Sequence, residues 1–185
     1  MKTIIGDLEF TCAKDNPELT SKTVMEAILN IEGGNQNNDK ICVAEIYPDF
    51  SDTAQFCEKY KIDAGQVANC VILEAKRGER VWFAACLVLS NTKADVNGLA
   101  RKTLDARRIS FAPMEKAVTE SSMEYGAITP IGLPIGWSIL VDQSITKLDY
   151  VIIGSGIRKS KLAVPGSLFA SLPNAQILDG LGINL

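Results

Sequence analysis

The chain alternates short apolar runs with polar, turn-forming segments, which is typical of a domain built largely from strands. The two strongest apolar runs span residues 70–75 and 80–89, and residues 76–79 between them suit a hairpin loop. Shorter apolar runs predict further strands. These cover residues 8–12, 41–46, 109–111, 137–141, 150–153, 162–164 and 177–178.

Helices are predicted between only some of these strands. Thr20 or Ser21 can cap a helix whose apolar face carries Val24, Ile28 and Ile31. Other helices or helical turns are predicted after Asp52, Asp63 and Pro113 and over residues 95–104 and 165–172, with a polar loop at 33–38. Strands that follow one another with only some intervening helices favour an α+β domain over a doubly wound sheet.

The charge balance argues against a broad nucleic-acid-binding face. The net charge is −3 and the pI about 5.1, whereas a surface that holds many phosphates is usually basic. Basic residues gather in two places along the chain, at Arg101, Lys102, Arg107 and Arg108 and at Arg158, Lys159 and Lys161. Each cluster suits an ordinary solvated face, and a local basic patch stays open as the alternative.

The absence of histidine narrows the possible chemistry. It excludes Ser-His-Asp triads, Cys-His pairs and HExxH zinc sites, so catalysis would use other side chains, backbone amides or the substrate itself. The five cysteines are odd in number and no two have CxxC spacing. We therefore expect reduced thiols, with no zinc and no cofactor.

The chain has no segment suited to a membrane or to secretion. Residues 1–12 lack the apolar core of a signal peptide, and no apolar stretch approaches the roughly 18 residues of a membrane span. We therefore expect a cytoplasmic protein without a membrane partner.

The segment 125–136 is the first candidate for a functional loop. Its three glycines and two prolines exclude a regular helix or a central strand. Glycine allows backbone N–H groups to approach a ligand closely, as an oxyanion hole requires. The alternative is a structural connection packed by Ile128, Ile131 and Leu133.

Two further candidates follow from local chemistry. Gly154, Ser155 and Gly156 follow an apolar strand and could bind an anion through backbone amides, with Arg158 as the counter-charge. The alternative is a tight turn. Asn69 lies between a predicted helical turn and a strand, where its simplest role is a helix C-cap.

In combination these segments resemble the YbaK family, also called the prolyl-tRNA-synthetase-associated editing domain. The resemblance covers about residues 45–179 of a single domain at 1–185, and residues 1–44 form an N-terminal extension. Its most specific element is the GxxxP motif at Gly126 and Pro130, with weaker matches at 53–57, 66–73 and 140–158. The resemblance implies a mixed, partly closed sheet surrounded by helices. It also implies hydrolysis of the ester that joins a wrong amino acid to the 3′ adenosine of a tRNA.

The resemblance also implies roles for individual residues. Catalytic roles fall on Gly126, Thr129 and Pro130, because a backbone amide of this loop holds the carbonyl region of the substrate in related proteins. There, a ribose 2′-hydroxyl or a cysteine thiol can assist the attack. The implied contacts to the 3′ end of aminoacyl-tRNA are Asn69, Gly154, Ser155, Gly156 and Arg158.

One position departs from the family pattern. Relatives usually carry a lysine where this chain has Asn69, which keeps hydrogen bonding but loses the positive charge. Three functions therefore stay open. The first is trans-editing of mischarged aminoacyl-tRNA, the second is a non-catalytic module that binds a nucleotide or aminoacyl compound in the same pocket, and the third is hydrolysis of other small esters.

Overall fold

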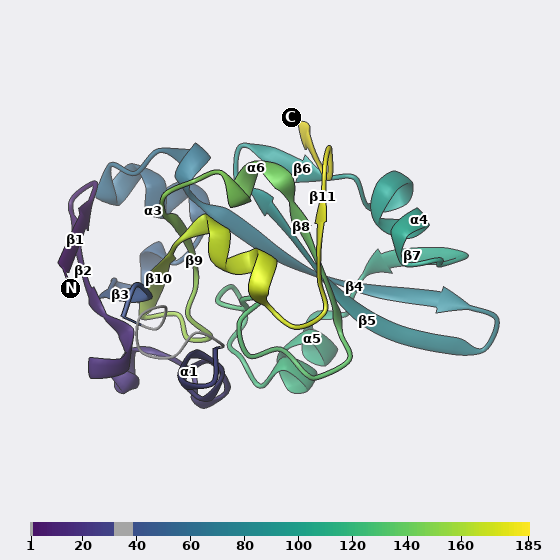
Figure 1. Ribbon diagram of the computed structural model, residues 1–185, viewed down its shortest axis with the longest axis horizontal. Coiled ribbons are helices and arrows are strands. Elements are labelled where there is room, and N and C mark those ends of the chain that lie inside the picture. Colours follow the sequence, from purple (N-terminus) through teal and green to yellow (C-terminus); the bar gives the residue numbers. More distant parts are fainter. Residues whose placement is uncertain (1, 32–38) are drawn as a thin grey trace.

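Two five-stranded sheets form the framework of the protein (Figure 1). The structure is a computed structural model, and it describes residues 2–31 and 39–185. The polar loop predicted at 33–38 lies outside the described residues. The first sheet is antiparallel throughout. Its order is β1 (Lys2–Ile5), β2 (Leu8–Cys12), β3 (Cys42–Glu45), β10 (Ser160–Val164) and β9 (Val151–Gly154).

The second sheet is mixed. Its order is β11 (Ala175–Leu178), β8 (Ser138–Asp142), β5 (Arg80–Leu89), β4 (Ala68–Arg77) and β7 (Arg108–Phe111). The neighbours of β8 are parallel to it, whereas the β4–β5 and β4–β7 pairs are antiparallel. A parallel bridge between Val67 and Ile152 joins the two sheets where β4 and β9 begin. The predicted α+β fold with a partly closed sheet is therefore confirmed.

Short helices cover the sheets and fill the connections. The α-helices are α1 (Lys22–Leu29), α3 (Thr53–Tyr60), α4 (Arg101–Thr103), α5 (Met114–Ser121) and α6 (Gln143–Thr146). As predicted, the Ser21 hydroxyl caps α1 and the Asp52 carboxylate caps α3. No helix of the described residues is long and apolar enough to cross a membrane.

Several predicted elements differ in detail from the structure. Asn69 does not cap a helix but lies inside β4, paired with Val88 of β5. The hairpin loop is only residues 78–79, since pairing continues to Arg77 and Arg80 and Gly78 adopts a φ of 60°. The segment 95–104 is a π-helical turn followed by α4, and residues 166–171 form a 3-10 helix. A two-stranded sheet of β6 (Thr92–Ala94) and β12 (Gly182–Asn184) was not predicted.

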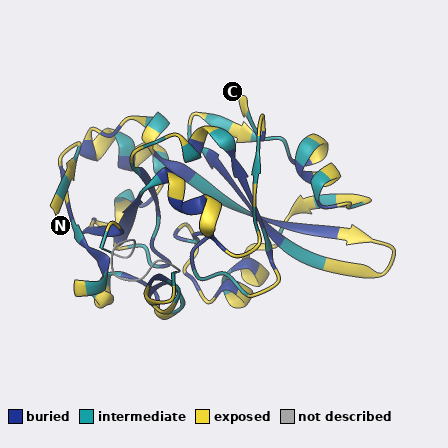
Figure 2. Cartoon of the chain, viewed as in Figure 1, coloured by how far each residue is buried: buried dark blue, intermediate teal, exposed yellow. Residues whose placement is uncertain are grey.

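The main core lies between the two sheets, as the buried strand centres in Figure 2 indicate. Ile153 and Leu162 of the first sheet pack in one cluster with Leu87 and Val141 of the second. A second cluster packs α3 against the first sheet through Phe56. The first sheet is thus packed on both faces, and the bridge from Val67 brings the start of β4 against β9.

Candidate active site

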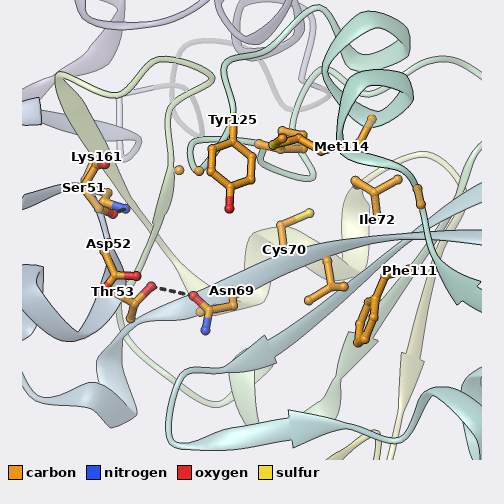
Figure 3. Close-up of a pocket in the computed structure, with 17 residues that line it drawn as sticks. Ser51, Asp52, Thr53, Asn69, Cys70, Ile72, Phe111, Met114, Tyr125 and Lys161 are labelled. Carbon is orange, nitrogen blue, oxygen red and sulfur yellow. Dashed lines mark hydrogen bonds between the residues drawn. The ribbon is translucent and has the colours of Figure 1, made fainter.

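A cavity of about 520 Å³ opens where β4, β9 and β10 approach the segment 125–128 (Figure 3). The start of α3 and the connection from β7 to α5 complete its wall. It therefore lies at the junction of the two sheets, where the largest glycine- and proline-rich loop of the chain passes.

The lining of the cavity changes from polar to apolar. Figure 3 shows Asp52, Asn69 and Lys161 on one side and Ile72 and Phe111 on the other. Such a division suits an amphipathic ligand that presents an apolar body to one wall and polar groups to the other. Exposed apolar side chains border the apolar part. They are Phe111, Met114 and Tyr125.

The loop that contains Gly126 presents unused backbone donors. Gly126 has a φ of 77°, a conformation that favours glycine. The Ala127 N–H donates to Glu124 O at 3.0 Å, whereas the N–H groups of Gly126 and Ile128 form no hydrogen bond with any described residue. Gly126 and Ile128 both line the cavity. Neither N–H group is therefore used within the described residues, a condition that the oxyanion-hole hypothesis sets.

Three predicted site residues meet in this cavity: Asn69, Gly126 and Gly154. Gly154 lies so close to the loop that a Cβ there would be 2.8 Å from the Ala127 carbonyl carbon. Thr129 is fully buried and its hydroxyl has no partner among the described residues. Pro130 lines a different hollow, so any influence of Thr129 and Pro130 on a ligand would pass through the shape of the loop.

The other residues of the predicted anion site, Ser155, Gly156 and Arg158, hold the loop in place and do not line the cavity. Ser155 is buried and its hydroxyl lies 2.7 Å from that of Ser160. Gly156 donates its N–H to Ala127 O at 2.9 Å. The Arg158 guanidinium donates to Tyr125 O at 3.3 Å and to Pro48 O at 3.2 Å.

Asn69 is oriented by its neighbour on α3. Its side-chain oxygen accepts a hydrogen bond from the Thr53 hydroxyl at 2.7 Å, the dashed line in Figure 3. This contact joins β4 to the first turn of α3 and places an uncharged amide at the polar end of the cavity.

Lys161 is a cavity residue that was not predicted from the sequence. Its charged neighbours Arg158 and Lys159 predicted a solvated face, but Lys161 is only 6% exposed and lines the cavity. The ammonium donates to Ser51 O at 3.0 Å and lies 5.3 Å from the centre of the Phe56 ring. Burial lowers the pKa of Lys161 to about 8, opposed by Asp52 and Cys57. Lys161 directly precedes the apolar residues of β10, and this position could have indicated that it is buried.

The cavity thiol is a poor nucleophile. Burial raises the pKa of Cys70 far above its usual range, so the thiol stays protonated at neutral pH. The five cysteines are free thiols in the structure. Within residues 2–31 and 39–185, no group of His, Cys, Asp or Glu side chains is arranged to hold a metal ion. The cavity also holds the Asp52 carboxylate, the Lys161 ammonium and the hydroxyl of Tyr125.

Comparison with known proteins identifies the family. The model of the aminoacyl-tRNA editing domain matches residues 47–171, so the chain belongs to this family, and the resemblance to YbaK proteins is confirmed. Aminoacyl-tRNA editing is therefore its general functional class. No curated protein matches the sequence significantly.

Solved structures support the fold. A candidate trans-editing enzyme for prolyl-tRNA synthetase is 14% identical with a TM-score of 0.68, over 86% of this chain and 96% of that one. A hypothetical protein is 13% identical with a TM-score of 0.73, over 88% and 100%. A candidate signal transduction protein from Marinobacter aquaeolei VT8 is 18% identical with a TM-score of 0.59, over 89% of this chain but 31% of that one. At these identities the likeness establishes the fold alone.

A lysine at position 69 tests how the missing charge affects tRNA binding. We expect Asn69→Lys to lower the Kd for tRNA by about 3- to 10-fold at low salt, since charge-assisted hydrogen bonds are strong but an exposed lysine delivers less. The gain should shrink as salt rises. Filter binding at two salt concentrations measures this, with Asn91→Lys, which adds the same charge at an exposed turn outside the cavity lining, as the control. Equal gains from both variants would contradict a specific contact.

Proposed function

We propose that the protein hydrolyses the ester bond of mischarged aminoacyl-tRNA as a free-standing, trans-acting editing enzyme. The observation that carries the proposal is the pair of unused N–H groups of Gly126 and Ile128 in the wall of the amphipathic cavity. They are suited to hold the ester carbonyl oxygen, while the apolar wall receives the amino-acid side chain or the adenine. Membership in the aminoacyl-tRNA editing family supports this substrate class.

The reaction requires no histidine in this proposal. Water attacks the ester carbonyl carbon, the carbonyl electron pair moves to oxygen, and the bond to the ribose oxygen then breaks. The Cys70 thiol is protonated and therefore poorly suited to assist the attack. The ribose 2′-hydroxyl of the substrate can assist it instead. The products are the amino acid and a tRNA with a free 3′ end. A positioned backbone donor contributes about 10²–10³ in rate in known enzymes.

A basic edge of the protein supports a nucleic-acid substrate despite the net negative charge. Arg101, Arg107 and Arg108 line a shallow hollow of about 440 Å³ beside β7, together with Lys76, whose ammonium pairs with Glu74 at 2.9 Å. The next residues along this edge, including Phe111, border the cavity. Phosphates of a tRNA could contact this hollow while its 3′ end enters the cavity.

A second candidate function has its own support. The uncharged Asn69 and the protonated Cys70 leave the cavity without two groups that would favour turnover. These residues are compatible with a module that binds an aminoacyl or nucleotide compound without hydrolysis. Deacylation measured over a panel of mischarged tRNAs separates the two functions, because a binding module would retain the ligand without releasing the amino acid.

Gly126→Ala tests the loop. We expect deacylation to fall by about 10-fold or more, since alanine disfavours a φ of 77° and its Cβ would lie 3.1 Å from an Arg158 nitrogen. Gly78→Ala is the matched control. Gly78 has a φ of 60° in the distal hairpin with no atom within 4 Å of an added Cβ, so it imposes similar strain away from the cavity. Full activity of a folded Gly126→Ala protein would place the site elsewhere.

A further inference from the structure

Lys161 and the Gly126 loop lie on the same side of the first sheet. Lys161 of β10 is paired directly with Gly154 of β9. Side chains of directly paired residues project to the same face of a sheet. A Cβ added to Gly154 would contact the backbone of Ala127, so this face is the one that the loop covers. The Lys161 side chain therefore extends beside the loop segment that presents the free N–H groups, and both line one cavity (Figure 3).

The charge of Lys161 is poorly compensated within the protein. Its ammonium has three donors, and Ser51 O is its hydrogen-bond acceptor among the described residues. No carboxylate of these residues forms a salt bridge with it. A buried ammonium without a paired carboxylate is unfavourable for folding, and such groups are concentrated at functional sites.

The groups around Lys161 leave it mainly charged at neutral pH. Its pKa is lowered to about 8, mainly by burial and in smaller part by the nearby Arg158 guanidinium. Asp52 at the start of α3 and Cys57 within that helix act in the opposite direction. At pH 7 the side chain is thus mostly an ammonium, with donors left for a ligand in the cavity.

We propose that Lys161 is a catalytic residue whose ammonium stabilises the negative charge that forms on the ester carbonyl oxygen of the substrate. This role rests on the proposed hydrolysis. Water adds to the carbonyl carbon and the carbonyl electron pair becomes the oxyanion, which the ammonium and the loop N–H groups contact. The oxyanion then re-forms the carbonyl as the bond to the ribose oxygen breaks. The water proton passes to that oxygen, and Lys161 keeps its own proton throughout.

The test compares deacylation by the wild type, Lys161→Met and Lys161→Arg. We expect Lys161→Met to lower kcat by about 10²-fold with little change in KM, and Lys161→Arg to retain part of the activity. After subtraction of spontaneous hydrolysis, the wild-type kcat should fall as pH rises through about 8, and this fall should be absent in Lys161→Met. Lys159→Met removes the same charge from an exposed position of the same hairpin and should leave kcat unchanged.

A binding measurement separates this proposal from the proposed function. Trace labelling of lysines with acetic anhydride, read by mass spectrometry, is carried out with and without an amide-linked aminoacyl-adenosine analogue. We expect the analogue to protect Lys161 but not Lys159. If the wild type deacylates tRNA while Lys161→Met has an unchanged kcat and pH profile, the role of Lys161 is overturned and the function stands. If kcat instead rises through the same pH range, Lys161 acts as a base. Absence of both turnover and analogue binding overturns both proposals.

Discussion

Gly154→Ala should abolish most deacylation activity, by about 10²-fold, and lower the free energy of unfolding by about 1–3 kcal/mol. The added methyl group would overlap the Ala127 carbonyl oxygen and lie 2.8 Å from its carbon and 3.0 Å from Ile128 O. These atoms belong to the backbone and cannot rotate away. The loop must therefore move away from β9, and its N–H groups then lose their position relative to Lys161.

A matched variant separates loss of activity from loss of stability. Gly166→Ala also creates a backbone clash, since its Cβ would lie 2.6 Å from Leu148 O, but Gly166 is outside the cavity lining. Urea unfolding gives the stability of both variants, and deacylation is measured on the folded fraction. Activity lost equally in both would attribute the effect to destabilisation. Wild-type activity in Gly154→Ala would show that deacylation does not depend on the close approach of β9 to the loop.

Local signals explain what could be predicted from the sequence. The β4–β5 hairpin follows from two long apolar runs around Gly78, and the starts of α1 and α3 follow from Ser21 and Asp52. Each depends on residues close together in the chain. The sequence also identified the Gly126 loop as irregular, because three glycines and two prolines exclude regular structure whatever lies around them.

The missed features depend on contacts between distant segments. Lys161 was placed on a solvated face because its neighbours Arg158 and Lys159 are charged, yet β10 is paired on both sides within its sheet and α3 covers it. Asn69 was placed at a helix end because the turn capped by Asp63 was expected to run to Asn69. The turn ends at Gln66, and pairing with β5 extends β4 to include Asn69. The cavity itself arises where Val67 and Ile152 join the two sheets, a contact between residues 85 positions apart in the chain.

The burial of Lys161 should make the wild type less stable than Lys161→Met at neutral pH. A lysine has a pKa of about 10.4 in an unfolded chain, against about 8 in the folded protein. Between these values the unfolded state binds more protons, so the stability of the wild type should rise with pH, by about 3 kcal/mol in total. Below about pH 8 the cost of the buried charge is fully present, and methionine removes it.

The two variants should therefore converge as pH rises. At pH 7 we expect Lys161→Met to gain about 1–2 kcal/mol, because loss of the hydrogen bond to Ser51 O offsets part of the benefit. The gain should disappear near pH 10, where the folded wild type carries a neutral Lys161. Urea unfolding at several pH values measures the difference, and Lys159→Met should follow the wild type. If Lys161→Met is less stable than the wild type at pH 7, the ammonium stabilises the folded protein. A more stable but inactive variant would mean that the protein keeps a destabilising charge in this cavity for its chemistry.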